Sequence, residues 1–516
     1  VAFDLSAACS GFVFALNTVH SFLTAGIYRT GLVIGADTLS KLVDWNDRGT
    51  CVLFGDGAGA AVVRAEDTGI MGLTMGADGT KGDVLKCGGR TTGNFLTGKK
   101  PELGYMTMDG QEVFKFAVKT VPEAIKKTIA GSGTELEEIK YFIEEYTKGT
   151  VTDYQAAALI MAMYINGLNN EETTNLTLEM AHSGEILDLS KISKTVIDKH
   201  STGGVGDKIT LVLMPIIASL GVPVAKMSGR GLGFTGGTVD KLESIPGYKT
   251  EIKIDEFIEN VQKVGISLIG QTANLAPADK KIYALRDTIS CVDNMSLIAS
   301  SIMSKKIAAG ANKIVLDVTC GSGAFMQNEK DAIELSNIMK NIGKLANRET
   351  VCIITNMDEP VGYAIGNSLE IIETIECLKG NIPEDIKEII TTIGAYILKL
   401  ADKGDNLEEN KLKILENIKN GKAYNKFLEL VQNQNGDIEY VKNTDKFEKA
   451  KYILPVICEK NGYVEKLNAG EVGKISVDLG AGRLRKEDDI DKAVGIVLNK
   501  KNADKVKKGD ILAFVY

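Results

Sequence analysis

Histidine is scarce in this 516-residue chain, which has only His20, His182 and His200. So few imidazoles exclude any chemistry that relays protons through several histidines. The chain also lacks an apolar stretch of about 20 residues, the length that a membrane-spanning helix needs. If the protein is an enzyme, it must therefore depend mainly on other polar side chains.

An excess of basic charge is absent too, since 60 Lys and Arg stand against 68 Asp and Glu, for a net charge of -8. This balance excludes the broad basic surface that nucleic-acid binding requires. Any anion site must concentrate its cations locally. The eight cysteines are dispersed without metal-ligand spacing. With no signal peptide in view, we expect reduced thiols and a cytoplasmic protein.

Two glycine-rich loops are the strongest positive feature of the chain. Residues 198–207 have the sequence Asp-Lys-His-Ser-Thr-Gly-Gly-Val-Gly-Asp. Residues 228–243 have the sequence Ser-Gly-Arg-Gly-Leu-Gly-Phe-Thr-Gly-Gly-Thr-Val-Asp-Lys-Leu-Glu. One such loop is more often a tight turn than a site, but glycines let backbone N–H groups approach an anion. The pair therefore predicts a phosphate site, to which charge or hydroxyl groups are added by Lys199, Ser201, Ser228 and Thr238.

The second loop is similar, nearly letter for letter, to the signature of the thymidine and pyrimidine-nucleoside phosphorylases. The resemblance extends over residues 143–516. It implies a pentosyltransferase that converts uridine, thymidine or deoxyuridine and phosphate into the free base and (deoxy)ribose-1-phosphate, in pyrimidine salvage. It also implies no organic cofactor, and a homodimer that binds neither nucleic acid nor membrane.

The resemblance implies three groups of site residues. Phosphate is expected at Lys199, Ser201, Thr210, Lys226, Ser228 and Thr238. The pyrimidine is expected at Arg286, Ser301 and Lys305. A monovalent cation, expected to be K+, is assigned to oxygens at Gly206, Lys208 (backbone), Val361, Ala364 and Glu373. Hard oxygen ligands suit such an ion.

His200, Arg286 and Lys305 form the expected catalytic set. His200 is expected to contact O2 of the base, as a hydrogen-bond donor or as a general acid. A neighbouring lysine disfavours its charged form and bound phosphate favours it, so the sequence leaves that choice open. Ser301 and Lys305 are four residues apart, which puts them on one face of a helix.

Residues 1–142 resemble a different family. Residues 4–12, Asp-Leu-Ser-Ala-Ala-Cys-Ser-Gly-Phe, are similar to the nucleophile segment of β-ketoacyl-acyl carrier protein synthase III. We expect Cys9 at a strand-to-helix junction, where helix N–H groups favour a thiolate. The family's His-Gln-Ala-Asn and Gly-Asn-Thr-Ser motifs are absent, so we interpret Cys9 as a remnant nucleophile. The other segments that agree are residues 35–40, 54–61 and 108–114.

Helical and β-branched segments alternate through the remainder of the chain. Residues 154–167 predict an apolar helix closed by a glycine, and residues 314–318 and 351–355 predict strands. This alternation is typical of a parallel sheet flanked by helices. The polar residues 441–451 are interpreted as a linker. Further helices are expected at residues 175–183, 277–287 and 297–309.

The predicted fold class is α/β, with a small helical domain, a parallel-sheet α/β domain and a C-terminal β-rich domain, preceded by an incomplete thiolase-like α/β fragment. The predicted boundaries are 1–142 for the ketosynthase III fragment, 143–183 and 281–312 for the helical domain, 184–280 and 313–445 for the α/β domain, and 446–516 for the β-rich domain.

Two alternative functions stay open. A phosphoribosyltransferase of the anthranilate type would share the fold, but it needs paired acids for magnesium and a pyrophosphate loop. The base set of Arg286, Ser301 and Lys305 argues against it. The other alternative is an inactive chimera, in which a ketosynthase III fragment is mis-joined to a phosphorylase.

Overall fold

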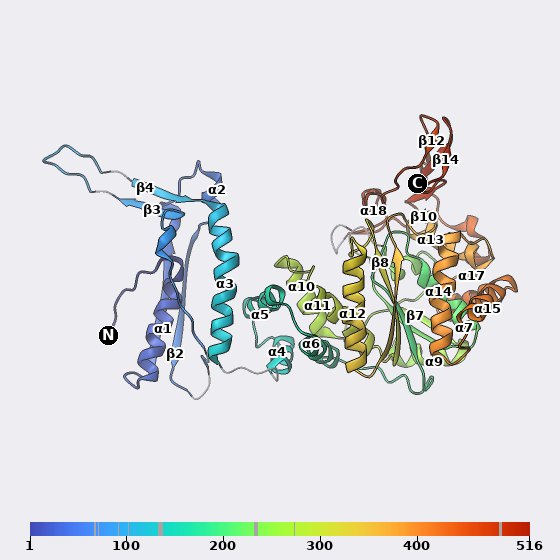
Figure 1. Ribbon diagram of the computed structural model, residues 1–516, viewed down its shortest axis with the longest axis horizontal. Coiled ribbons are helices and arrows are strands. Elements are labelled where there is room, and N and C mark those ends of the chain that lie inside the picture. Colours follow the sequence, from blue (N-terminus) through green and yellow to red (C-terminus); the bar gives the residue numbers. More distant parts are fainter. Residues whose placement is uncertain are drawn as a thin grey trace. The chain divides into compact units, whose positions relative to one another are not determined.

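The computed structural model describes residues 1–66, 69–70, 72–90, 92–101, 103–132, 138–231, 236–272, 274–483 and 488–516. Packing divides the chain into two compact units, Val1–Glu138 and Ile139–Tyr516 (Figure 1). Each unit is described by itself. No helix in these ranges is both long enough and apolar enough to cross a membrane.

The first unit consists of two antiparallel strand pairs with helices. β1 (Thr30–Thr38) pairs with β2 (Asp56–Arg64), and β3 (Leu85–Arg90) pairs with β4 (Leu103–Met108). α1 (Gly11–Thr24) packs against β1. The remaining elements are η1 (Ala8–Ser10), η2 (Leu39–Lys41), α2 (Arg48–Cys51), η3 (Gly79–Lys81) and α3 (Gly110–Ser132).

Cys9 lies in η1, directly before α1, and is exposed. The helical half of the predicted strand-to-helix junction is therefore confirmed. The strand half is wrong, because residues 1–7 pair with none of the described strands and so have no hydrogen-bond ladder to hold them extended.

The helical domain of the second unit comes from two chain segments. A capping box of Thr152 and Gln155 begins α5. Gly167 ends the helix with a φ of 70°, and the sequence predicts this glycine end. A second capping box, Asn169 with Glu172, begins the next helix. The helices are α4 (Glu138–Lys148), α5 (Asp153–Asn166), α6 (Asn170–His182), α10 (Pro277–Thr288) and α11 (Met295–Ala308).

Parallel strands form the centre of the α/β domain, as predicted. β5 (Ile197–Ser201), β8 (Lys313–Cys320) and β9 (Glu349–Asn356) make one sheet, and β6 (Val224–Ser228) pairs with β7 (Ile266–Gly270). β6 contacts β5, and α7 (Ile209–Ser219) connects the two. Figure 1 shows α12 and α14 on opposite faces of these strands. The other helices are α8 (Thr238–Leu242), α9 (Ile254–Val264), α12 (Glu329–Leu345), α13 (Asn367–Leu378), α14 (Glu384–Leu400), α15 (Leu407–Lys419), α16 (Lys422–Asn433), α17 (Ile438–Lys442) and η4 (Thr444–Lys446).

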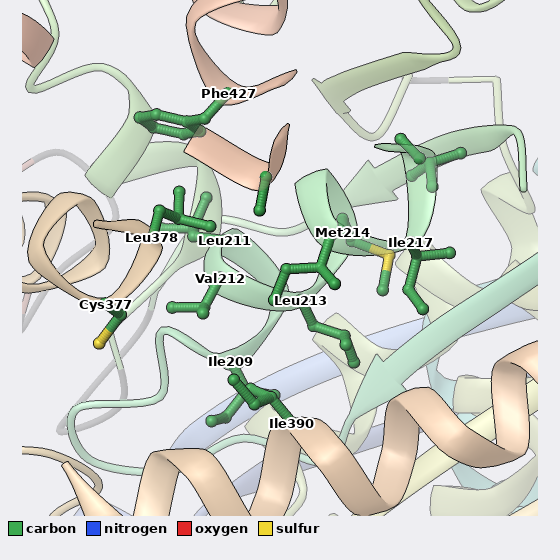
Figure 2. Close-up of a cluster of buried hydrophobic side chains, with 14 of the residues drawn as sticks. Ile209, Leu211, Val212, Leu213, Met214, Ile217, Cys377, Leu378, Ile390 and Phe427 are labelled. Carbon is green, nitrogen blue, oxygen red and sulfur yellow. The ribbon is translucent and has the colours of Figure 1, made fainter. Parts of the chain in front are cut away.

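α7 is apolar on every side, so it can only be a buried helix. Every residue of its first three turns, from Ile209 to Ala218, is buried. Figure 2 shows its side chains packed among Leu378 of α13, Ile390 of α14 and Phe427 of α16. This packing fixes the position of the α7 N-terminus, which follows the first glycine loop.

The C-terminal domain is rich in short strands, as expected. Its antiparallel sheet has the order β10-β13-β15-β11. The predicted linker at residues 441–451 is wrong in its first part, because Val441 and Phe447 are buried in the core while their charged neighbours face outward. The elements are β10 (Ala364–Ile365), β11 (Leu454–Ile457), β12 (Gly462–Tyr463), α18 (Ala469–Asp478), β13 (Ile496–Leu498), β14 (Lys505–Val506) and β15 (Ile511–Val515).

Candidate active site

β5 carries the centre of the site, because successive side chains of a strand point to opposite faces. Lys199 and Ser201 therefore share one face, and Asp198 and His200 share the other. The strand ends at the first glycine loop, so both faces meet the loop at the carboxyl edge of the sheet. Ligands of open α/β sheets bind at this edge.

Lys199 supplies a buried cation on the first face. Its side chain is 0% exposed, and its Nζ lies 3.0 Å from Oδ2 of Asp317 on β8. This contact is an ion pair outside strict hydrogen-bond geometry, so Asp317 balances the charge of the ammonium without saturating its three N–H donors. Burial opposes its charge, but Asp317 and Asp207 outweigh burial and raise the pKa of Lys199. Lys199 therefore stays charged with unused N–H donors.

The first glycine loop leads directly into α7. Asp207 Oδ1 accepts the Ile209 N–H at 3.2 Å, and the Asp207 carbonyl accepts the Lys241 ammonium at 2.7 Å. Thr210, predicted to bind phosphate, lies in the first turn of α7 and is buried. A helix N-terminus with its free N–H groups favours an anion.

The second glycine loop is described only at its ends, and residues 232–235 lie outside the described residues. Ser228 is the buried last residue of β6, and Thr238 is the first residue of α8. Asp240 anchors the loop, since its Oδ2 accepts the Gly231 N–H at 2.7 Å. The structure thus places Ser228 and Thr238 where the loop leaves β6 and where it enters α8.

A buried cluster of two lysines and one aspartate occupies the other face of β5. Asp198 Oδ1 lies 3.0 Å from Lys226 Nζ, and Asp198 Oδ2 lies 2.8 Å from Lys306 Nζ. Burial lowers the pKa of Lys226 to about 7; Asp198 opposes this shift, and repulsion by Lys306 adds to it. Lys226 was predicted to bind phosphate, but in this structure its ammonium is paired with Asp198.

His200 belongs to the same face and is half-buried. Its ring makes no hydrogen bond with the described residues. Burial holds its pKa well below the ordinary value of 6.5, and repulsion by Lys306, Lys226 and Lys305 adds to the effect. A neutral imidazole can donate one hydrogen bond. Without ligand, this geometry favours the donor role of His200 over that of a charged general acid.

Ser301 and Lys305, which are expected to bind the base, lie on one face of α11, as their spacing predicts. Lys305 Nζ donates to Ser301 Oγ at 2.9 Å and to Asp279 Oδ2 of α10 at 2.6 Å. Asp279, which is buried, was not expected from the sequence. Because it lies 26 positions before Lys305 along the chain, no local pattern could have revealed the pair.

Arg286 makes backbone contacts that the sequence did not predict. Its guanidinium is 2% exposed and donates to three backbone carbonyls between α10 and the first turn of α11. Those acceptors are Cys291 O at 3.2 Å, Val292 O at 2.7 Å and Leu297 O at 3.1 Å. A guanidinium has five N–H donors, so few remain for a pyrimidine. Arg286 therefore holds the connection that positions Ser301 and Lys305.

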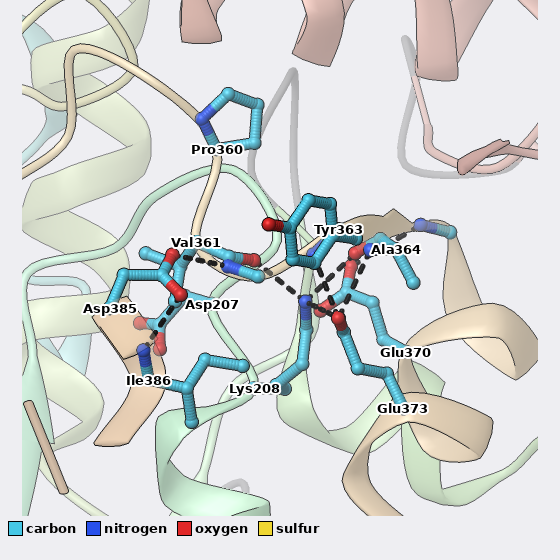
Figure 3. A network of polar contacts seen from close by, with 12 residues as sticks. Asp207, Lys208, Pro360, Val361, Tyr363, Ala364, Glu370, Glu373, Asp385 and Ile386 are labelled. Atoms are coloured by element: carbon cyan, nitrogen blue, oxygen red, sulfur yellow. Dashed lines mark hydrogen bonds and ion pairs between the residues drawn. The ribbon is translucent and has the colours of Figure 1, made fainter. Parts of the chain in front are cut away.

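The expected potassium ligands are brought together, but around an ammonium. Figure 3 shows Lys208 Nζ among the carbonyls of Val361 and Ala364 and the carboxylate of Glu373. The Lys208 carbonyl accepts the N–H groups of the first turn of α7, and the Gly206 carbonyl accepts the Lys208 N–H. The residues as they stand therefore do not fit a free K+ ion.

Comparisons with known proteins assign both units. Residues 3–79 match the family 3-Oxoacyl-[acyl-carrier-protein (ACP)] synthase III. A crystal structure of such a synthase from Aquifex aeolicus VF5 shows 41% identity, covers 27% of this chain and 42% of its own, and has a TM-score of 0.23. The family match over residues 3–79 agrees with the predicted ketosynthase III fragment.

Three further family descriptions match in succession, and the first of these matches begins in α3 of the first unit. Residues 122–184 match the helical bundle domain and residues 193–424 the a/b domain of the glycosyl transferase family, and residues 463–516 match the pyrimidine nucleoside phosphorylase C-terminal domain. The pyrimidine-nucleoside phosphorylase of Geobacillus stearothermophilus is 51% identical over 76% of this chain and 91% of its own. That of Bacillus subtilis (strain 168) is 51% identical over 75% and 89%. The chain belongs to the pyrimidine-nucleoside phosphorylase family.

Proposed function

We propose that this protein catalyses phosphorolysis of pyrimidine nucleosides. An oxygen of hydrogen phosphate forms a bond to C1′ while the C1′–N1 bond breaks. The electron pair of that bond leaves with the base, and the proton of the hydrogen phosphate ends on the base. The products are the free pyrimidine and (deoxy)ribose-1-phosphate. The observation that carries the proposal is the buried Lys199 ammonium, whose charge Asp317 balances without saturating its three N–H donors, beside the α7 N-terminus, in a chain of this family.

Phosphate binding is assigned to the first face of β5 and to the glycine loops. Lys199 supplies charge, and Ser201, Thr210, Ser228 and Thr238 supply hydroxyl groups. Fixed donors in a water-poor site stabilise an anion without reorganisation. We keep Lys226 in this set as a cation behind the site, since Asp198 holds its ammonium.

The departing pyrimidine gains negative charge, which donors at its ring must absorb. Ser301 and Lys305 are assigned to the edge of the base, and His200 donates from its neutral ring to O2. Arg286 positions this set through the carbonyls before α11. Asp279 fixes the direction of the Lys305 ammonium.

Base release from uridine and thymidine in saturating phosphate tests the proposal directly. We expect uracil and thymine to form, with pentose-1-phosphate in equal amount. Omitting phosphate should stop release, which distinguishes phosphorolysis from hydrolysis, and pyrophosphate should not replace phosphate. A folded preparation that releases neither base would rule the proposal out.

The same proposal includes a homodimer and a cytoplasmic location. The dimer rests on the resemblance alone, and light scattering coupled to size-exclusion chromatography tests it. The same measurement separates a folded enzyme from an aggregating chimera. The eight free cysteines support the location, because a reducing compartment keeps such thiols unpaired.

A further inference from the structure

We propose that Lys208 is a built-in monovalent cation: its ammonium occupies the place of a free ion and joins the first glycine loop to residues 360–367. Three oxygens surround the Lys208 Nζ. We name them the lysine cage, which consists of Val361 O, Ala364 O and Glu373 Oε2.

The geometry of the lysine cage is complete. Lys208 Nζ lies 2.7 Å from Val361 O, 2.8 Å from Ala364 O and 2.6 Å from Glu373 Oε2. An ammonium has three N–H donors and no acceptor, so each donor has one oxygen. The Lys208 side chain is 0% exposed. All three N–H donors of this ammonium are therefore used, and it needs neither a water molecule nor a second cation beside it.

The surroundings are shaped for this ammonium. Gly206 has a φ of 70°, and a Cβ there would stand 2.6 Å from Val361 O and 3.5 Å from Lys208 Nζ. Glu373 is held in turn by the N–H groups of Tyr363, at 2.7 Å, and Ala364, at 3.0 Å. The carboxylate therefore faces the ammonium in a fixed direction.

The charge balance is local. Burial opposes the charge of Lys208, but Glu373 and Glu370 outweigh it and raise its pKa above 10.5. Lys208 therefore stays charged at any ordinary pH. A second lysine, Lys241, pairs with Glu370 at 2.6 Å, so Glu370 and Glu373 each have a cation of their own.

The position of Lys208 explains what the cation does. Lys208 is the N-cap of α7, one residue after Asp207 of the glycine loop. Its side chain ties this point to the segment before α13, where the Val361 N–H also donates to the Val205 carbonyl. Lys208 is thus a positioning residue for the phosphate loop. A tethered cation is always bound, whereas a free ion depends on its concentration.

The first test uses the wild-type protein in KCl or in choline chloride at equal ionic strength. The melting temperature should agree within about 1 °C between the two salts, and KM for phosphate should also agree. The melting temperature does not depend on the proposed activity, so failure of one proposal is distinguishable from failure of the other. Stabilisation of the wild type by K+ over choline would overturn the inference.

The second test removes the ammonium with Lys208→Ser, which leaves the lysine cage open. In choline chloride we expect a melting temperature lower by roughly 5 °C or more, and a KM for phosphate raised roughly tenfold. Adding KCl or ammonium chloride should reverse both changes, because either ion can take the vacated oxygens. A folded Lys208→Ser protein that K+ does not rescue would contradict the inference.

Lys501 provides a matched control. Its Nζ also bonds a carbonyl and a carboxylate, Pro360 O at 2.9 Å and Asp385 Oδ2 at 2.5 Å, but it has two such oxygens rather than three. Lys501→Ser should be destabilised without K+ rescue. The double variant Lys208→Ser with Glu373→Gln should also show no rescue by K+. Equal rescue of Lys501→Ser would mean a general salt effect and overturn the assignment to Lys208.

Discussion

At the scale of single residues, the site depends on which buried charges have partners. Lys199 keeps unused donors, Lys208 has none left, and Lys226 shares Asp198 with Lys306. The same residue type therefore serves three purposes within one region. The difference comes from the number of acceptors within reach of each ammonium, not from the lysine itself.

Lys226 should make stability depend on pH. Its pKa is about 7 in the folded chain against an ordinary 10.5, so folding disfavours its charged form. The resulting penalty is complete below about pH 7 and disappears as the pH rises toward 10.5. Between about pH 7 and pH 9, the wild type should gain up to about 1.4 kcal/mol per pH unit over Lys226→Met.

Urea unfolding of both proteins from about pH 6 to about pH 9 measures this difference. Lys280→Met is the control, because Lys280 is exposed on α10 and its variant should follow the wild-type curve. If the Lys226→Met curve also runs parallel to the wild type, Lys226 titrates normally and the argument fails.

Lys305→Ala should reduce turnover strongly. Loss of one fixed donor to developing charge costs roughly 2.7–4 kcal/mol of barrier lowering, or 10²–10³ in kcat. Steady-state rates with uridine under saturating phosphate give the number, and Lys280→Ala on the neighbouring helix is the control. A folded Lys305→Ala enzyme with a rate near wild type would remove Lys305 from the base site.

Arg286→Ala should lose stability as well as activity. The substitution leaves three buried carbonyls without their donor, at about 1–3 kcal/mol each. Arg286→Lys keeps the charge but lacks the planar guanidinium with its several N–H donors. It should therefore recover only part of the lost stability. Urea unfolding measures this stability loss. An unchanged unfolding free energy in Arg286→Ala would show that these bonds are not structural.

At the scale of elements, α7 is the part on which the first glycine loop depends. It has a positive-φ glycine near each end, Gly206 at 70° and Gly221 at 80°. Both positions resist a side chain for backbone reasons. Only Gly206 also faces backbone, because its Cβ would stand 2.6 Å from Val361 O, whereas that of Gly221 would meet only the end of Lys403.

Gly206→Ala should therefore destabilise the protein more than Gly221→Ala does, and it alone should raise KM for phosphate. The left-handed backbone costs both variants about 1–2 kcal/mol of stability. The difference between their stability losses therefore isolates the contact with the Val361 carbonyl. Thermal unfolding and phosphate titrations of the two variants provide the comparison. Equal KM values for phosphate in the two variants would show that the first glycine loop tolerates displacement from residues 360–367.

Elements with strong local patterns were predictable, and non-local partners were not. The apolar period and capping residues gave α5, and β-branched runs gave β8 and β9. The linker failed because composition does not reveal that Val441 and Phe447 share one core. The Asp279 partner of Lys305 also escaped prediction, since an ion pair across 26 positions leaves no local pattern. Lys208 and Glu373, 165 positions apart, were grouped only through the family resemblance, which assigned them to a K+ ion rather than to an ion pair.

At the scale of the whole molecule, the chain joins a part that belongs to the phosphorylase family to a unit that is similar to part of a second family. The first unit exposes large apolar side chains on its paired strands, among them Leu32 and Ile34 of β1 and Val62 of β2. Strand faces of this kind normally pack against another layer. The described residues of this unit therefore leave apolar surface in contact with solvent.

Cys9 should accordingly have no part in turnover. It is exposed at the start of α1, but His20 is the only histidine of its unit and lies on α1 itself. The resembled family needs a histidine and an asparagine on later loops to drive condensation. A thiol without that pair can be alkylated but has no partner for acyl transfer.

Cys9→Ala should thus leave phosphorolysis unchanged, and the wild type should form no acetyl-enzyme with acetyl-CoA. Intact-protein mass spectrometry checks this, with iodoacetamide labelling of Cys9 as proof that the thiol is accessible. A stable acetyl adduct that Cys9→Ala abolishes would show that the first unit retains the first step of its family's chemistry.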